Sequence, residues 1–171
     1  MRKTNIQAVL ATFILCMMVW IFITWSFAVQ ELAAGVIVSA AVALFSSRFF
    51  IHREPWQIFN PVKIMNAVLY IFVFLKEVIV SNWEMAKRVY GGCKVNPGIV
   101  RIPTGLDGEY PLAVLADSIT LTPGTITMDV AEEDGKNCMY IHWIDVLTED
   151  GEEAGKIIKE NLENGVRRIF G

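Results

Sequence analysis

Residues 5–47 read NIQAVLATFILCMMVWIFITWSFAVQELAAGVIVSAAVALFSS, and Glu31 is the only charged residue among them. A continuous helix over this stretch would be roughly 65 Å long at about 1.5 Å per residue. The hydrocarbon core of a bilayer is only about 30 Å thick. The chain is therefore expected to turn back at its one polar place, Gln30-Glu31. This predicts a transmembrane helical hairpin with spans at Ile6–Trp25 and Ala33–Phe50.

Small residues in the second predicted span favour a tight hairpin, because they let two helices approach closely in lipid. They are Gly35, Ser39, Ala40, Ala41 and Ala43. A cleaved signal peptide is the alternative, with Arg2-Lys3 before the apolar run and Ser26-Phe27-Ala28 as the cleavage site. The run is longer than a typical signal core and a second run follows at once, which favours the hairpin.

A third apolar stretch, Val62–Met85, follows Pro61, a residue that suits the first turn of a helix. Its polar residues recur at gaps near three, four or seven and so trace one narrow stripe along a helix. They are Lys63, Asn66, Tyr70, Glu77, Ser81, Glu84 and Arg88. Two placements are open: a third span whose stripe, with Lys76 nearby, faces protein neighbours, or an interfacial helix in the headgroup plane.

Basic residues flank the apolar stretches, whereas the hairpin turn has none. They are Arg2 and Lys3, then Arg48, Arg53 and Lys63, then Lys87, Arg88, Lys94 and Arg101. If basic flanks lie on the cytoplasmic side, an even number of crossings satisfies all of them. A cytoplasmic C-terminal domain is therefore expected. The length and hydropathy of residues 62–85 still resemble a span, so the place of this helix stays open.

The composition separates an apolar first half from a charged last third. Of 171 residues, 54% are hydrophobic and 19% charged, against about 25% charged in soluble domains. The net charge of −3 argues against nucleic acid as a partner, which needs a basic face. Cys16, Cys93 and Cys138 show no spacing of a zinc site or a disulfide framework. The predicted division is 1–60 for the hairpin, 61–90 for the third helix and 91–171 for a polar domain.

The polar domain is predicted to be a small α+β unit of order β-α-β-β-α. The first strand is Ile99–Pro103, the first helix is Pro111–Ile119, and the closing helix carries apolar residues at helical spacing from Ala154 to Ile169. One strand begins at Thr125 and a second covers Cys138–Val146. These two strands form a hairpin that lies between the two helices along the chain. Residues 118–121 are either the end of the helix or a strand of their own.

Thr122-Pro123-Gly124-Thr125 is predicted to be a sharp bend. Proline fixes φ at the second position of a type II turn, and glycine takes the positive φ that the third position demands. After the bend, Ile126, Met128 and Val130 alternate with polar residues, which indicates a strand with one buried face.

Residues suited to catalysis are scarce. His142 lies on a predicted strand, and the second histidine, His52, is placed at the membrane edge, so a structural role is favoured over a metal ligand. The acidic residues near 129–134 lack the offsets of a calcium loop. No nucleophile elbow, phosphate loop or dinucleotide motif occurs, so the sequence predicts neither an enzyme nor a cofactor.

Lys76, Glu77 and Glu84 are the candidate functional residues of the third apolar helix. Ionisable groups inside a membrane commonly mark ion paths. The alternative is that Lys76 and Glu77 pair with one another or extend to the headgroups from a helix near the surface. The sequence favours the second interpretation.

Three motifs resemble the MrpE/MnhE family, which are subunits of Mrp-type multisubunit cation/proton (Na⁺/H⁺) antiporters. They are LADSITLTPGT at 115–125, TMDV at 127–130 and YIHWIDV at 140–146, and PGIVRIP at 97–103 is also similar. The resemblance implies an accessory subunit in a bacterial or archaeal cell membrane. Its partners would be other subunits of the complex and the lipid bilayer, and its role would be assembly and stability rather than the main ion path. Thr122, Pro123, Gly124 and Thr125 are the family positions it carries over. A stand-alone membrane-tethered binding module is the alternative function.

Overall fold

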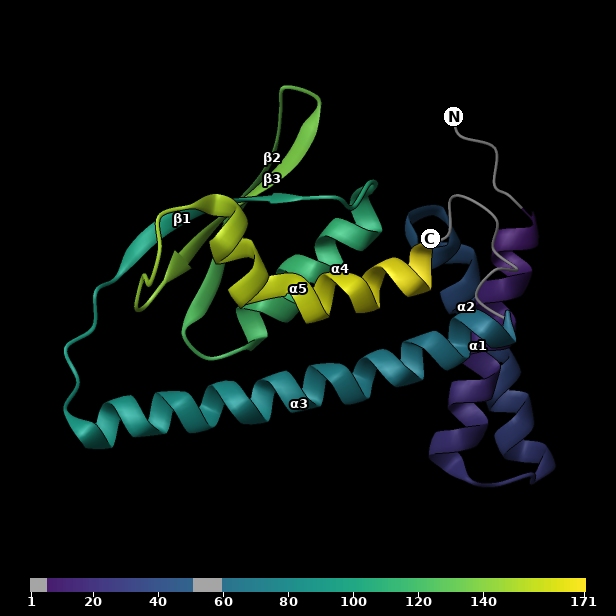
Figure 1. Ribbon diagram of the computed structural model, residues 1–171. Coiled ribbons are helices and arrows are strands. Elements are labelled where there is room, and N and C mark those ends of the chain that lie inside the picture. Colours follow the sequence, from purple (N-terminus) through teal and green to yellow (C-terminus); the bar gives the residue numbers. More distant parts are fainter. Residues whose placement is uncertain (1–5, 51–59) are drawn as a thin grey trace. The chain divides into compact units, whose positions relative to one another are not determined.

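The computed structural model describes residues 6–50 and 60–171, without the side chains of 46–50. The chain divides into two compact units, Met1–Asn60 and Pro61–Gly171. The predicted basic flanks at Arg2, Lys3 and Arg53, the side chain of Arg48, and His52 lie outside the described residues. Each unit has its own helix packing, shown in Figure 1.

The first unit is a helical hairpin of α1 (Ile6–Thr24) and α2 (Val29–Phe50). The turn between them lies at residues 25–28, where Trp25 adopts a positive φ of 48°. It therefore comes earlier than the predicted turn at Gln30-Glu31. Those two residues lie in the first turn of α2, where the Glu31 carboxylate complements the positive end of the helix dipole.

Small residues form the contact between α1 and α2. Among the hairpin side chains that the structure describes, the buried ones are Ala8, Ala11 and Thr12 on α1 and Gly35, Ser39 and Ala43 on α2. A methyl group at Gly35 would lie 2.6 Å from Cδ1 of Trp20, so only glycine allows this approach. Trp20 Nε1 also donates a hydrogen bond to the Glu31 carbonyl, 3.1 Å away. The close approach expected of small residues is thus present at three of the five predicted positions, all on one face of α2.

The two threonine hydroxyls of α1 are satisfied within their own helix. The Thr12 hydroxyl donates to the Ala8 carbonyl at 2.8 Å, and the Thr24 hydroxyl donates to the Trp20 carbonyl at 2.9 Å. Such internal bonding is what a helix needs where no water is present. Helix α1 is long enough and apolar enough to cross a membrane, whereas the apolar part of α2, Val29–Phe45, is shorter.

The second unit contains α3 and a small α+β domain. Helix α3 covers Pro61–Gly91, and β1 (Gly98–Thr104), α4 (Glu109–Leu121), β2 (Thr125–Glu133), β3 (Lys136–Trp143) and α5 (Gly151–Phe170) follow. The predicted order β-α-β-β-α is therefore confirmed. Residues 118–121 belong to α4, and β3 ends at Trp143 rather than at Val146.

The sheet is antiparallel with the order β1-β3-β2. An Asp134-Gly135 turn with φ of 51° and 72° joins β2 to β3, as the twist of a two-residue hairpin requires. Both outer strands are irregular: β2 has a bulge between Thr127 and Asp129, and β1 contains Pro103. Helices α4 and α5 cover one face of this sheet, and α3 runs along the outer side of α5 (Figure 1).

The core lies between the sheet and its helices. Its fully buried large side chains are Ile102, Leu115, Ile119, Met139, Ile141, Leu162 and Val166. Tyr70 of α3 joins this cluster. Its hydroxyl donates to Oγ of Ser118, because the Ser118 hydroxyl is already committed to the Val114 carbonyl at 2.7 Å. Helix α3 is thus part of the domain's core.

The start of β2 buries the opposite side from the one that its hydrophobic alternation suggests. Thr125 is buried, whereas Ile126 and Met128 are 50% and 60% exposed. Thr127 donates to the Ala116 carbonyl of α4 at 3.1 Å, so the threonine side faces the helices. Ile126 pairs with His142, which also pairs with Ile99. These residues form a row on the uncovered face of the sheet.

A close contact with α5 fixes the position of α3. A methyl group at Gly165 would lie 2.5 Å from Cδ2 of Tyr70. On either side, Asn66 Nδ2 donates to the Arg168 carbonyl at 2.8 Å and Asn161 Nδ2 donates to Glu77 at 2.9 Å. One face of α3 is thus held against α5 by polar contacts around a glycine.

We expect Gly165→Ala to lower the free energy of unfolding of the second unit by about 1–3 kcal/mol, because overpacking forces backbone shifts. Gly155→Ala is the matched control in the same helix, since its methyl group would lie 3.4 Å from Cε of Lys159, an ordinary contact. The control should be neutral or stabilising by about 0.5–1 kcal/mol. Thermal unfolding of the detergent-solubilised full chain measures both, and equal effects would contradict this account of the helix contact.

Candidate functional site

The bend at residues 122–125 ends α4 and begins β2. The Thr122 hydroxyl donates to the Ile119 carbonyl at 2.7 Å, and the Thr125 hydroxyl lies 2.8 Å from the same carbonyl. The two hydroxyls are 3.1 Å apart, and both threonines are buried. The last carbonyls of a helix have no partner within it. The two threonines therefore cap α4 and bury its end without leaving Ile119 unsatisfied.

Gly124 places the bend against α3 and against the residues that follow β3. Its φ of 101° is the positive value predicted for the third position of the turn, and few other residues adopt it. A methyl group here would lie 3.1 Å from Cε of Met85 and 3.2 Å from Cγ2 of Ile144. The Ile144 N–H donates to the Gly124 carbonyl at 2.9 Å. The bend thus joins three segments that are distant in sequence.

A cleft of about 210 Å³ lies between α3, the bend and α5. The side of α3 that lines it is polar and includes Glu77, Ser81, Glu84 and Arg88. The bend contributes all four of its residues, Thr122, Pro123, Gly124 and Thr125, and α5 contributes Ile157, Ile158 and Leu162. Most of the sequence-predicted site residues therefore meet around one cavity. Its polar and apolar walls suit water or a small polar group.

The candidate ionisable residues of α3 do not all face the cleft. Glu77 and Glu84 line it, and Glu77 accepts the hydrogen bond from Asn161. Lys76 is exposed and lies about 100° away from Glu77 around the helix. The contact found for Glu77 is thus with Asn161 of α5, whereas pairing with Lys76 is one form of the second interpretation of the sequence.

An ion pair closes one end of the cleft. Arg88 of α3 pairs with Asp145, which follows β3, and Asp145 also accepts the Asn96 N–H at 3.2 Å. The connection from α3 to β1 and the segment after β3 therefore share one carboxylate. His142 lies apart from this cleft, on the uncovered face of the sheet. No group of His, Cys, Asp and Glu suited to a metal ion occurs among residues 6–50 and 60–171.

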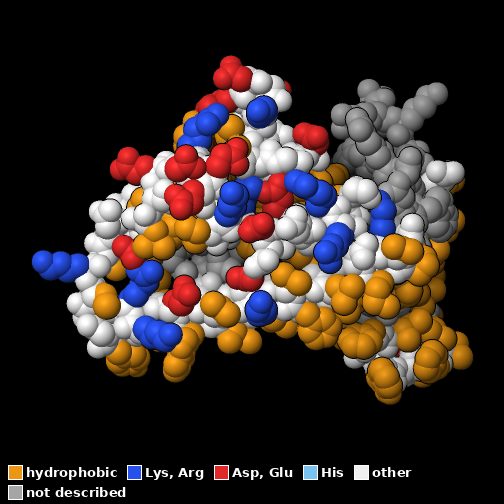
Figure 2. Space-filling model, viewed as in Figure 1, with side chains coloured by type: hydrophobic (Ala, Val, Ile, Leu, Met, Phe, Trp, Pro, Cys, Tyr) orange, Lys and Arg blue, Asp and Glu red, His pale blue; other side chains and the backbone are white. Residues whose placement is uncertain are grey.

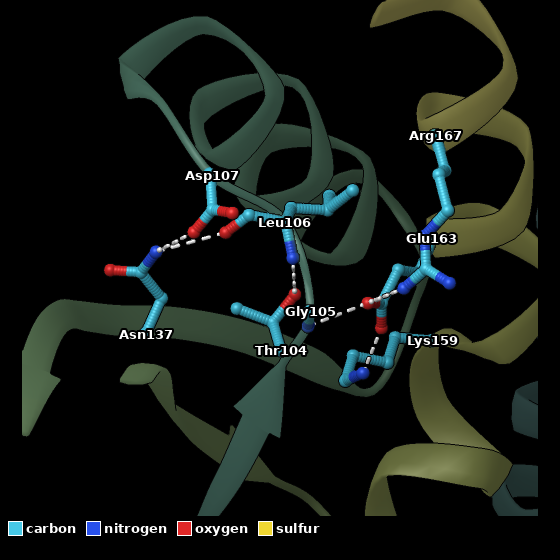
Figure 3. A network of polar contacts seen from close by, with 8 residues as sticks. All are labelled: Thr104, Gly105, Leu106, Asp107, Asn137, Lys159, Glu163 and Arg167. Atoms are coloured by element: carbon cyan, nitrogen blue, oxygen red, sulfur yellow. Dashed lines mark hydrogen bonds and ion pairs between the residues drawn. The ribbon is translucent and has the colours of Figure 1, made fainter. Parts of the chain in front are cut away.

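A second polar cluster joins α5 to the loop after β1 (Figure 3). Glu163 is buried, pairs with Lys159 and accepts the Gly105 N–H at 2.8 Å. Arg167 contacts the same carboxylate at 3.0 Å. Beside it, Asn137 Nδ2 donates to the Leu106 carbonyl at 2.9 Å. The motifs of the sequence do not predict this cluster, although the spacing of Lys159, Glu163 and Arg167 by four residues marks them as one face of a helix.

The pKa of the Glu163 carboxyl is lowered from its usual value. Burial by itself raises this pKa, but the hydrogen bonds from Lys159 and from the Gly105 backbone, together with the charge of Lys159, lower it by more. The carboxylate form is therefore the form that the fold stabilises, and it holds the β1–α4 loop against α5.

The fold as a whole joins apolar helices to an open-faced α+β domain that is backed by one of them. Family comparison agrees with this architecture. The family model MNHE, described as a Na⁺/H⁺ ion antiporter subunit, matches residues 13–169. The chain belongs to this family.

Named relatives cover nearly the whole chain. The E-type Na⁺/H⁺ antiporter subunit of Bacillus subtilis is 29% identical over 88% of this chain and 90% of its own length. The E1-type Na⁺/H⁺ antiporter subunit of Staphylococcus haemolyticus is 31% identical over 88% of this chain and 90% of its own length. A chain of the membrane-bound sulfane sulfur reductase, an archaeal respiratory membrane complex, matches with a TM-score of 0.81 at 39% identity, covering 96% of this chain and 99% of that one.

We expect Glu163→Gln to cost about 3 kcal/mol at neutral pH, because it leaves Lys159 buried without its counter-charge. A lowered pKa adds stability that is present above the unfolded-state value and is lost as pH falls through the folded-state value. The difference in unfolding free energy between the two proteins should therefore shrink below about pH 4.5, the ordinary pKa of the group. Exchange of the Gly105 amide hydrogen should also speed up in the variant. The exposed Glu160→Gln is the control, and a pH-independent difference for Glu163→Gln would contradict the argument.

We expect Gly124→Ala to be more damaging than Gly135→Ala. Both glycines have positive φ, which costs other residues about 1–2 kcal/mol, but no atom lies within 4 Å of the methyl position at Gly135. The excess cost at Gly124 measures how tightly the bend packs against α3. It is read from the thermal unfolding of the two variants, and similar midpoints would show that the bend is not held by these contacts.

Proposed function

We propose that this chain is an accessory subunit of a multisubunit Na⁺/H⁺ antiporter complex in the cell membrane. It supports the assembly and stability of the complex, and the main ion path lies in other subunits. The α1–α2 hairpin crosses the bilayer and the α+β domain lies on its cytoplasmic side. Family membership over residues 13–169 is the observation that carries the proposal.

The scarcity of charge in the hairpin supports an accessory role. Between Lys3 and Arg48 the sequence contains one charged residue, Glu31, and it lies beside the hairpin turn rather than midway along a helix. A path for ions across a membrane needs polar or ionisable groups at depth. The described hydroxyls of α1 are already bonded to backbone carbonyls of the same helix.

The uncovered face of the sheet supports a role in assembly. Ile99, Ile126 and Met128 are exposed by half or more, at 62%, 50% and 60%, and they share this face. A patch of this kind on an otherwise polar domain is typical of a protein contact surface. A partner protein is the expected occupant of this face. This agrees with the relatives, which are named antiporter subunits, and with the similar chain of an archaeal membrane complex.

Purification of the tagged chain from cells that express the full set of antiporter genes tests the proposal. In mild detergent, we expect larger membrane proteins to copurify in fixed stoichiometry. Arrival of the chain alone would instead favour the stand-alone binding module. Family relatives are subunits by name, so the first outcome is expected.

The accessory part of the proposal has its own test. We expect the double variant Glu77→Gln/Glu84→Gln to assemble, and to leave both antiport per assembled complex and its Na⁺ dependence unchanged. Gly124→Ala should lower the amount of assembled complex instead, with little change in antiport per complex. Activity is measured in everted membrane vesicles and divided by the quantity of purified complex. A loss of antiport per complex at unchanged assembly in the double variant would place these carboxylates in the ion path.

A further inference from the structure

We propose that α3 lies in the plane of the membrane surface, as an interfacial helix. Its outer face is buried among the headgroups and upper acyl chains of a phospholipid bilayer, and its inner face carries the α+β domain. This placement of the helix does not depend on the proposed antiporter function.

The inner face of α3 is covered by the domain along most of the helix. Asn66 bonds to the Arg168 carbonyl near one end, Tyr70 enters the core, and Glu77 bonds to Asn161. Near the other end, Arg88 pairs with Asp145. These contacts recur at helical spacing, so they follow one stripe of the helix. It is the polar stripe that the sequence predicts.

The length of the contact between α3 and the α+β domain argues against an α3 that spans the bilayer while the domain stays folded against it. From Asn66 to Arg88 the helix rises roughly 33 Å at about 1.5 Å per residue, which is slightly more than the thickness of the hydrocarbon core, about 30 Å. If α3 crossed the bilayer over these residues, the side of α5 that packs on it would also lie in the hydrocarbon core. That helix contains Glu163, Lys159 and exposed Arg168, and charged groups at such depth are costly.

The outer face of α3 is apolar along its length (Figure 2). Between Ile64 and Ile79 the side chains opposite Tyr70 are hydrophobic except for Lys76 at one edge, and Ile79 is 69% exposed. The exposed members of this face are Ile64, Met65, Val68, Leu69, Ile71, Phe72, Leu75, Ile79 and Trp83. Protein interfaces carry about one hydrogen bond per 100–200 Å², and between Ile64 and Ile79 the only polar side chain that this face offers is Lys76, at one edge. Its chemistry fits lipid better than another protein.

The borders of the apolar face suit the headgroup layer. Trp83 and Lys87 form a cation–π contact, in which Lys87 Nζ lies over the indole ring, 5.6 Å from its centroid. Tryptophan is enriched at the level of the headgroups. Lys76 lies at the same edge as Lys87 around the helix and is exposed, so its long stem can reach the anionic phosphates from an apolar surface. Helix α3 is long enough and apolar enough to cross a membrane. Its exposed apolar residues are nevertheless concentrated on one side of the helix.

Spin labels at three positions on the outer face test this placement in the full-length chain. Met65, Phe72 and Ile79 are seven residues apart and exposed, so each is changed to cysteine separately, with Cys16, Cys93 and Cys138 replaced by alanine. The protein is reconstituted in bilayers of phosphatidylethanolamine and phosphatidylglycerol. Immersion depth is measured from the collision of each label with oxygen and with a water-soluble nickel chelate. A label at exposed Asp117 of α4 is the aqueous control.

For an interfacial helix, we expect the three labels on the outer face to share the same shallow immersion depth, within a few ångströms. The control label at Asp117 should remain in water. A membrane-spanning helix would change the depth by about 10 Å from each position to the next, and that result would overturn the proposal. Labels shielded from both reagents would also overturn it, because the face would then be covered by protein. The labelled positions lie outside the core, so a near-native thermal midpoint confirms that each labelled chain is folded.

Discussion

The contact between α3 and the α+β domain is the interaction on which the second unit depends. Helix α3 supplies Tyr70 to the core and a polar stripe to α5, and without it the apolar edge of the domain would face water. Conversely, the domain satisfies the stripe of a helix that is otherwise apolar. Each side therefore stabilises the other, and a helix of 31 residues becomes part of a folded domain.

Much of this fold can be predicted from the sequence, because its signals are local. The scarcity of charge before Arg48 predicts the hairpin, and the spacing of turns and apolar residues predicts the order of strands and helices after Gly98. Pro123-Gly124 predicts the bend, whose positive φ is observed. Polarity alone places the hairpin turn a few residues late. The chain bends at Trp25, where the sequence is apolar, since Gly35 must meet Trp20.

Other features could not be predicted, because they depend on pairs of distant residues. Hydrophobic alternation suggests that Ile126 and Met128 face the core, but the Thr125 hydroxyl is fixed to the Ile119 carbonyl and sets the opposite register. The cleft brings Glu77 and Glu84 to the bend only because α3 docks on α5. The buried Glu163 cluster needs the loop at Gly105, which lies 58 residues away along the chain, to complete it.

The two outer strands of the sheet have a consequence for neighbouring copies of the protein. Membranes concentrate their proteins in two dimensions, and an open sheet edge invites a further strand from another molecule. In β1, Pro103 lacks the N–H that such pairing uses, and in β2 the bulge after Thr127 interrupts the regular spacing of backbone groups. Crowded copies are thereby kept from polymerising edge to edge, although one broad face of each sheet is left open.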